Sequence, residues 1–194
     1  MIATSTVKQA HSWNRDIYDF YLEPEWCSKR LFDEERFSGN VADIACGTGR
    51  ILDAAKAAGY ETIGCDLVDR GARENHKFLS MDFRQAVFDI DNIVSNPPFK
   101  DAQEFAEFTL RRAKKKIALL LPTIWLHGSA RAKWLERTPL RRVLIMSPRP
   151  SMPPGEYVLS GQKVGGGTKD FSWFVWVQNY DGRPEIMHLQ RDRS

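Results

Sequence analysis

The sequence has few cysteines and no long apolar run. The cysteines are odd in number and show no C-x-x-C spacing, which excludes a secreted disulfide framework and favours a reducing cytoplasm. The longest apolar run, 117–126, is interrupted by Pro122 and Thr123 and is too short to span a bilayer. The polar start of the chain shows no secretory signal, so we expect a cytoplasmic protein without a membrane segment. The cysteines are Cys27, Cys46 and Cys65.

Sequence motifs typical of metal sites and of phosphate-binding loops are also absent. The four histidines show no metal-ligand spacing, so no catalytic metal is expected. No Gly-x-x-x-x-Gly-Lys-Ser/Thr run occurs, which excludes a P-loop nucleotidase. The histidines are His11, His76, His127 and His188.

Acidic and basic residues are unevenly distributed along the chain. Residues 1–99 carry a net charge of −5 and residues 100–194 a net charge of +8. Clustered basic residues favour phosphate binding. The alternative is that these residues lie on a helix face that is exposed to solvent. For the run 111–116 we favour the solvated face, because cations at a helix C-terminus oppose its dipole. The other candidates are Arg131, Lys133, Arg137, Arg141, Arg142, Arg149, Lys163 and Lys169.

The first half of the chain contains a strand, a glycine turn and a helix. Residues 41–45 form a short apolar strand, 46–49 read Cys-Gly-Thr-Gly, and the following helix closes at Gly59. A second strand, 61–65, ends in Asp66, about where a ribose-binding carboxylate falls in nucleotide-binding βαβ units. Leu52 stands where a dinucleotide fold would place its third glycine, which counts against NAD. A tight turn with a surface acid is the simpler alternative.

Asn96-Pro97-Pro98-Phe99 is the most informative segment. It follows the apolar run 90–95, which predicts a buried strand ending in a proline-locked loop. Ligands of open α/β sheets bind at the carboxyl ends of the strands. There the Asn96 side-chain oxygen and the Pro97 carbonyl can accept the two hydrogens of a planar amine, while Phe99 stacks on its ring. The alternative is a loop that the prolines merely stiffen.

The remaining pattern alternates strands and helices in a single domain over residues 1–194. Buried apolar strands covered by helices predict an α/β fold with a mostly parallel sheet. The stretch 147–170, with four prolines and five glycines, predicts a long loop that borders the substrate site. Expected strands are 41–45, 61–65, 77–81, 90–95, 116–121, 140–146 and 171–177, and expected helices are 25–37, 48–58, 68–75, 101–115 and 123–136. Trp173 and Trp176 cannot share one strand face, so at least one should be core.

Asp-Ile-Ala-Cys-Gly-Thr-Gly at 43–49, followed by Asn-Pro-Pro-Phe at 96–99, resembles the class I S-adenosylmethionine-dependent methyltransferases. Within that class the chain is similar to N6-adenine DNA methyltransferases, particularly small phage- and prophage-encoded ones. The segments 147–155, 165–167 and 171–176 extend the resemblance over nearly the whole chain. It implies a Rossmann-like, mostly parallel seven-stranded sheet with an antiparallel last strand and helices on both faces. Residues 1–38 would form an N-terminal arm and first helix.

The resemblance also implies roles for individual residues. The cofactor would be S-adenosylmethionine and the partner DNA or another amine-bearing macromolecule. Glu23 stands where the family has a threonine beside the methionine part of the cofactor. The implied catalytic residues are Asn96, Pro97, Pro98 and Phe99. Independently of the resemblance, Arg149 and Lys169 flank glycine- and proline-rich loop, which favours a role in binding a nucleic-acid substrate. The implied cofactor-binding residues are Glu23, Pro24, Trp26, Asp43, Ala45, Cys46, Gly47, Gly49, Asp66, Leu67, Asp82, Phe83 and Asn96.

Other functions remain open at the level of sequence. Similar Asn-Pro-Pro-Phe loops serve relatives that methylate RNA bases or protein glutamines. A non-catalytic cofactor- or nucleic-acid-binding protein is a second alternative, and an NAD oxidoreductase is a third.

Overall fold

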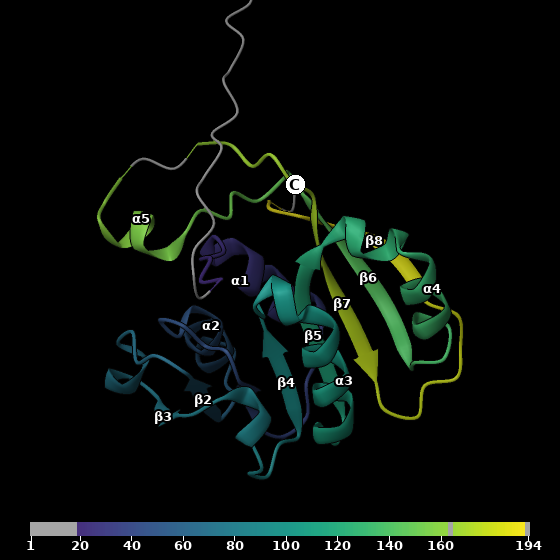
Figure 1. The fold of residues 1–194 in the computed structure, drawn as a ribbon, viewed down its shortest axis with the longest axis horizontal. Coiled ribbons are helices and arrows are strands. Elements are labelled where there is room, and N and C mark those ends of the chain that lie inside the picture. Colours follow the sequence, from purple (N-terminus) through teal and green to yellow (C-terminus); the bar gives the residue numbers. More distant parts are fainter. Residues whose placement is uncertain (1–18, 163–164, 193–194) are drawn as a thin grey trace, which may run out of the picture.

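A computed structural model describes residues 19–162 and 165–192 of the chain as a sheet with helices on both faces (Figure 1). The first 18 residues of the expected N-terminal arm and the candidate cation Lys163 lie outside the described residues. The strand order is β3-β2-β1-β4-β5-β7-β6-β8. The strands are β1 (Val41–Asp43), β2 (Thr62–Asp66), β3 (Lys77–Ser80), β4 (Asn92–Ser95), β5 (Lys116–Pro122), β6 (Leu140–Ser147), β7 (Phe171–Val177) and β8 (Glu185–Gln190).

The sheet is parallel except for β7, which runs antiparallel between β5 and β6. This confirms the antiparallel seventh strand. The expected count of seven is one too low, because β8 pairs in parallel with β6 and adds an eighth strand. Since β7 reverses direction, the stretch 148–170 leaves β6 and returns to β7 at the same edge of the sheet, the one where the other strands end.

The helices agree with the expected pattern at three of five places. The expected helix at 68–75 is wrong, because Gly71 takes a left-handed φ of 97° and only a 3₁₀ turn follows at Ala72–Glu74. The expected helix at 123–136 is divided by Gly128 into a 3₁₀ segment, Thr123–His127, and α4. The α-helices are α1 (Glu25–Glu34), α2 (Arg50–Ala57), α3 (Ala102–Arg112), α4 (Ser129–Leu135) and α5 (Gly155–Leu159), the last within the stretch expected to be loop.

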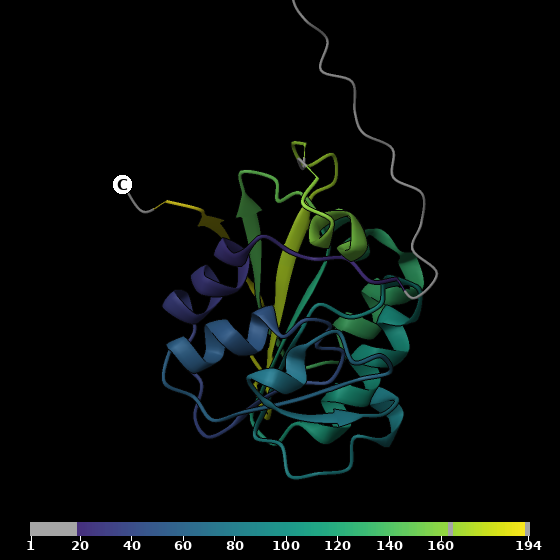
Figure 2. The same cartoon turned by 90° about the vertical axis from the view of Figure 1, so that its left-hand side faces the viewer.

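Two hydrophobic cores fill the space between the sheet and its helices. Figure 2 shows α1 and α2 on one side of the sheet and α3 on the other. Leu31 of α1 and Ala55 of α2 pack in one core, and Phe105 of α3 packs in the second. Trp173 lies in the first core and Trp176 in the second, both with no exposed surface. Both tryptophans are therefore core, on opposite faces of β7, as the alternation of a strand requires.

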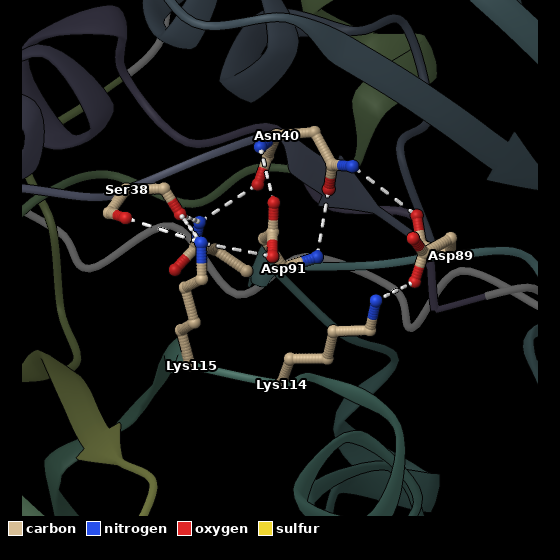
Figure 3. A network of polar contacts seen from close by, with 7 residues as sticks. Ser38, Asn40, Asp89, Asp91, Lys114 and Lys115 are labelled. Carbon is tan, nitrogen blue, oxygen red and sulfur yellow. Dashed lines mark hydrogen bonds and ion pairs between the residues drawn. The ribbon is translucent and has the colours of Figure 1, made fainter.

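A polar network joins the chain segments that enter β1, β4 and β5 (Figure 3). Asp91 N–H donates to Asn40 Oδ1 at 2.9 Å, and Asn40 N–H donates to Asp91 Oδ2 at 3.2 Å. Lys115 Nζ lies 3.1 Å from Asp91 Oδ1 and donates to the Ser38 carbonyl at 3.0 Å. The network lies at the amino ends of the strands and holds the connections that set the register there. The lysines of this network are thus engaged in ion pairs with neighbouring carboxylates.

In this network the Asp91 side chain lies so close to Gly39 that no side chain fits there. The φ of Gly39 is 90°, and a Cβ at this residue would overlap the Asp91 side chain. We expect Gly39→Ala to destabilise the fold by about 3 kcal/mol, because it combines left-handed backbone strain with a clash. Gly59 also has a φ of 90°, but no atom lies within 4 Å of the place that an added methyl group would take, so Gly59→Ala should cost only about 1 kcal/mol. Urea unfolding of both variants measures the difference, and equal losses would contradict the clash.

Among residues 19–162 and 165–192, no helix is long and apolar enough to cross a membrane.

Candidate active site

A cleft lies at the carboxyl ends of β1, β2 and β4, where the loops after these strands meet. Asp43 ends β1, Asp66 ends β2 and Asn96 directly follows β4. Parallel strands bring residues at their ends to one edge, and a change of strand order opens a crevice there. In this sheet β1 lies between β2 and β4, so the loops diverge at the cleft.

The glycine turn forms the floor of the cleft. Gly47 has a φ of 52° and Gly49 a φ of 90°, and α2 begins immediately afterwards at Arg50. The N–H of Gly47 donates to Asp66 Oδ2 at 2.8 Å, which ties the turn to the end of β2. Asp66 Oδ1 accepts from Val68 N–H and from the Arg70 guanidinium, each at 3.1 Å. Within the described part of the chain, the hydrogen bond given for Oδ2 is the one from Gly47, and a carboxylate oxygen has a second lone pair that can accept from a hydroxyl group.

Buried carboxyl groups make the inner wall of the cleft acidic. Asp43 Oδ1 accepts from Ser95 Oγ at 2.7 Å and from Ala45 N–H at 3.1 Å, and Asp43 is 1% exposed. Burial raises the pKa of Asp43 to about 8, with smaller contributions from the charges of Glu23 and Asp66. Burial also raises the pKa of Glu23. A cationic group in this cleft would lower both pKa values and favour the charged carboxylates.

The raised pKa of Asp43 predicts a pH-dependent effect of Asp43→Asn. The folded pKa lies above the unfolded value near 3.9, so the folded state loses stability as pH rises from about 4 to about 8. Asparagine keeps the acceptor oxygen but never ionises. We therefore expect Asp43→Asn to melt several degrees above the unaltered protein at pH 8 and at nearly the same temperature at pH 5. Calorimetry at both values measures this, and a constant difference would argue against a titrating Asp43.

The Asn96 side chain is fixed by two acceptors. Its Nδ2 donates to the Tyr21 carbonyl at 2.9 Å and to Glu23 Oε2 at 3.0 Å. Its Oδ1 is buried and has no hydrogen-bond partner within the described part of the chain. A buried acceptor without a donor is costly, and an amine entering the cleft would satisfy it. Asn96 and Pro98 line the cleft, and Pro97 is buried behind them.

Residues 19–23, called the strap below, lie across the cleft and touch both loops that border it. Asp19 Oδ2 accepts from Lys100 N–H at 2.8 Å, next to the proline loop. The Tyr21 ring stacks on Phe99 with centroids 5.6 Å apart. The strap is also bonded to the stretch 147–170. Leu22 N–H donates to the Pro153 carbonyl, and Gly155 N–H donates to the Phe20 carbonyl. The stretch 147–170 therefore reaches the cleft through the strap.

Most cofactor positions inferred from the sequence come together in this cleft, with four exceptions. Pro24 caps α1, and Gly49 caps α2. Trp26 faces the groove between α1 and α2 and does not line the cleft. Asp82 pairs with Arg84 at 3.1 Å rather than lining the cleft. The residues that do line it are Glu23, Asp43, Ala45, Cys46, Gly47, Asp66, Leu67, Phe83 and Asn96.

Three residues that the sequence analysis expects at the substrate do not line the cleft. Phe99 does not line the cleft but packs between Tyr21 and Phe171, with both ring centroids at 5.6 Å. Arg149 Nε donates to Asp170 at 2.6 Å, and Lys169 is exposed beside that pair. Neither cation lines the cleft.

The sequence reasoning missed several residues that line the cleft. Arg50 donates to the Glu23 carbonyl at 2.8 Å, and the Arg70 guanidinium lies 4.2 Å from the centroid of the Phe20 ring. Thr48 Oγ1, in the glycine turn beside the cleft, is buried without a partner in the described residues. These contacts join segments that are far apart in the sequence, so no local sequence pattern predicts them. The lining residues to which the sequence analysis assigns no role are Asp19, Phe20, Ile44, Arg50, Ile51, Val68 and Arg70.

Within the described ranges, no group of three or more His, Cys, Asp or Glu side chains could hold a metal ion.

Solved methyltransferase structures share this fold. A Pyrococcus horikoshii protein assigned as an RNA methyltransferase matches with TM-score 0.56 and 15% identity, over 79% of this chain and 80% of its own. Magnesium protoporphyrin IX methyltransferase from Synechocystis, solved with bound SAM, matches with TM-score 0.56 and 13% identity, over 80% and 79%. The M protein of the type I restriction enzyme EcoKI matches with TM-score 0.59 and 14% identity, over 90% of this chain and 49% of its own.

The chain therefore has the Rossmann-like fold of the class I methyltransferases. Neither a protein-family model nor a curated protein sequence matches it. At these sequence identities the similarity shows the fold alone.

Proposed function

We propose that this protein transfers a methyl group from S-adenosylmethionine to an exocyclic amine, namely N6 of adenine in DNA. The observation that carries the proposal is Asn96 Oδ1, a buried acceptor without a partner in the described residues, at the end of β4. An amino group is the ligand that such an oxygen lacks. The glycine turn and the acidic wall beside it supply a matching place for a cationic methyl donor.

The residues of the cleft fit this donor chemically. S-adenosylmethionine supplies a methyl group on a positively charged sulfonium. The buried carboxyl group of Asp43 favours positive charge in the cleft, because a cation nearby relieves the cost of ionising it. Asp66 would accept from ribose hydroxyls, and Phe83, 6% exposed, would lie beside the adenine ring. Gly47 lines the cleft, where an added Cβ would lie 2.8 Å from the Phe20 ring.

The acceptor amine would be held by Asn96 Oδ1 and by the Pro97 carbonyl. Two hydrogen bonds from the amine favour a pyramidal nitrogen with a localised lone pair. The nitrogen forms a bond to the methyl carbon while the carbon–sulfur bond breaks, with its electron pair going to sulfur. The nitrogen then releases one proton to water. Because this step needs alignment rather than a strong base, positioning by the rigid proline loop supplies much of the rate.

An adenine inside a duplex cannot reach this cleft, so the base has to be flipped or already unpaired. The strap and the proline loop border the cleft, the stretch 147–170 is bonded to the strap, and these segments would contact the flipped nucleotide. We also propose a cytoplasmic setting, as in phage- and prophage-encoded DNA methyltransferases. The three cysteines are free and buried, which suits a reducing compartment.

A protein glutamine is the second candidate acceptor. It is favoured because Arg149, a candidate phosphate contact, is paired with Asp170. Arg142, another candidate phosphate contact, pairs with Glu35 and Glu185 at the start of β6, at the opposite edge of the sheet. A side-chain amide needs no phosphate contacts, whereas duplex DNA gains affinity from them.

Incubation with methyl-labelled S-adenosylmethionine tests the proposal. Separate reactions would contain unmethylated double-stranded DNA, single-stranded DNA, total RNA and a protein extract. Label appearing as N6-methyladenine in DNA is the expected result. Label in protein alone would support the glutamine alternative, and cofactor binding without transfer to any acceptor would reject the proposed function.

A further inference from the structure

Glu23 holds the catalytic amide rather than the cofactor. We propose that the buried Glu23 carboxylate orients Asn96 and strengthens its Oδ1 as the acceptor for the substrate amine. This role rests on the proposed amine methyl transfer. It replaces the cofactor contact inferred from sequence at a position where the family has threonine.

The contacts around Asn96 determine which way its amide points. Nδ2 lies 2.9 Å from the Tyr21 carbonyl and 3.0 Å from Glu23 Oε2. A carbonyl only accepts, and so does an ionised carboxylate, so both hydrogens of the amide nitrogen are used. Rotating the amide by 180° would bring Oδ1 against two acceptors. The Glu23 contact therefore helps to turn Oδ1 toward the place of the substrate amine.

The burial of Glu23 makes this contact strong. The residue is 3% exposed, so its hydrogen bond to Asn96 is little weakened by water. Burial raises the pKa of Glu23, and the hydrogen bond from Asn96 and the charge of Arg50, at the start of α2, oppose this rise. A charge-assisted bond at Nδ2 also shifts electron density toward Oδ1, because the amide is conjugated. Positive charge that develops on the attacking nitrogen is then better stabilised.

Variants of Glu23 separate this role from a cofactor contact. Glu23→Met removes the acceptor and keeps a similar length, whereas Glu23→Gln keeps an acceptor oxygen without the charge. We expect Glu23→Met to lower kcat about 10- to 100-fold, the loss of one charge-assisted hydrogen bond. Glu23→Gln should recover part of that loss. The Kd for S-adenosylhomocysteine, measured by calorimetry, should change less than about twofold in both.

Nuclear magnetic resonance gives a readout that needs no turnover. The Asn96 side-chain amide pair is assigned by its absence in Asn96→Ala. In Glu23→Met one of its two hydrogens should move upfield and exchange faster with solvent, while Glu23→Gln should stay close to the unaltered protein. Glu25→Gln, at an exposed acid two residues away, is the matched control and should change nothing.

The outcomes distinguish this inference from the proposed function. An unchanged amide signal in Glu23→Met, or an unchanged kcat, would overturn the role of Glu23. A large loss of cofactor affinity in both variants would instead assign Glu23 to the cofactor and also overturn it. If the unaltered protein methylates no acceptor, the proposed function fails, while the amide signal still decides whether Glu23 holds Asn96.

Discussion

Asn96→Ala is expected to lower methyl transfer about 1,000-fold, as losses of a single transition-state hydrogen-bonding group do. The variant removes Oδ1, the buried acceptor at the end of β4. The Kd for S-adenosylmethionine should stay nearly the same, because the proposed cofactor contacts lie mainly on the glycine turn and Asp66. Single-turnover transfer and calorimetric binding, measured on the same preparation, give the two quantities.

Two controls accompany Asn96→Ala. Asn75→Ala changes an exposed asparagine and should leave both quantities unchanged. Thermal unfolding is needed as well, because the variant deprives Glu23 of the Asn96 donor and should cost about 1–3 kcal/mol of stability. If a folded Asn96→Ala protein lost rate and cofactor affinity to the same extent, the assignment of Asn96 to the acceptor would be wrong.

Asp66→Ala should have the opposite pattern. We expect the Kd for S-adenosylmethionine to rise about 100-fold, since the change removes charge-assisted contacts to the ribose. It also frees the Gly47 N–H, which Asp66 Oδ2 holds at 2.8 Å, so the glycine turn loses an anchor. At saturating cofactor, kcat should fall only slightly. Binding calorimetry and steady-state rates over a range of cofactor concentrations separate the two effects.

Asp69→Ala is the matched control for Asp66→Ala. Asp69 lies on the same loop and accepts from Gly71 N–H at 3.1 Å, but it does not line the cleft. Its replacement should leave the Kd within about twofold. Equal losses in the two variants would mean that the loop as a whole, rather than the Asp66 carboxylate, supports the cofactor.

Strands β1 to β7 could be predicted from the sequence because their signals are local. Short apolar runs bounded by glycine, proline and acidic residues define most of them, whereas β3, Lys77–Ser80, is largely exposed, and the proline pair after Ser95 marks the end of β4. The glycine turn and the proline loop were found for the same reason. That they meet in one cleft follows from the parallel order of β1 and β4.

β8 could not be predicted in the same way. Of the residues Glu185–Gln190 only Leu189 is buried, and Ile186 remains 67% exposed. A strand at the edge of a sheet needs few apolar residues, because most of its surface stays in water. Its pairing with β6 is set by backbone hydrogen bonds over a long separation in sequence, for which no residue pattern is specific.

Three further side chains have partners that no sequence pattern specifies. Asp82 is held by Arg84, which in turn pairs with Glu104 of α3. Trp26 points to the groove beside α2, and Phe99 is enclosed by Tyr21 and Phe171. In each case the residue type suited the inferred role, but the competing partner becomes visible only when the chain is folded.

The reversal of β7 has a consequence for how the acceptor could be changed. Both ends of the stretch 148–170 lie at the edge of the sheet that carries the cleft, whereas the polar network of Figure 3 lies at the opposite edge. We therefore expect that the stretch can be exchanged without disturbing this network. If the stretch contacts the acceptor, as proposed, such an exchange would change the acceptor and leave the scaffold intact.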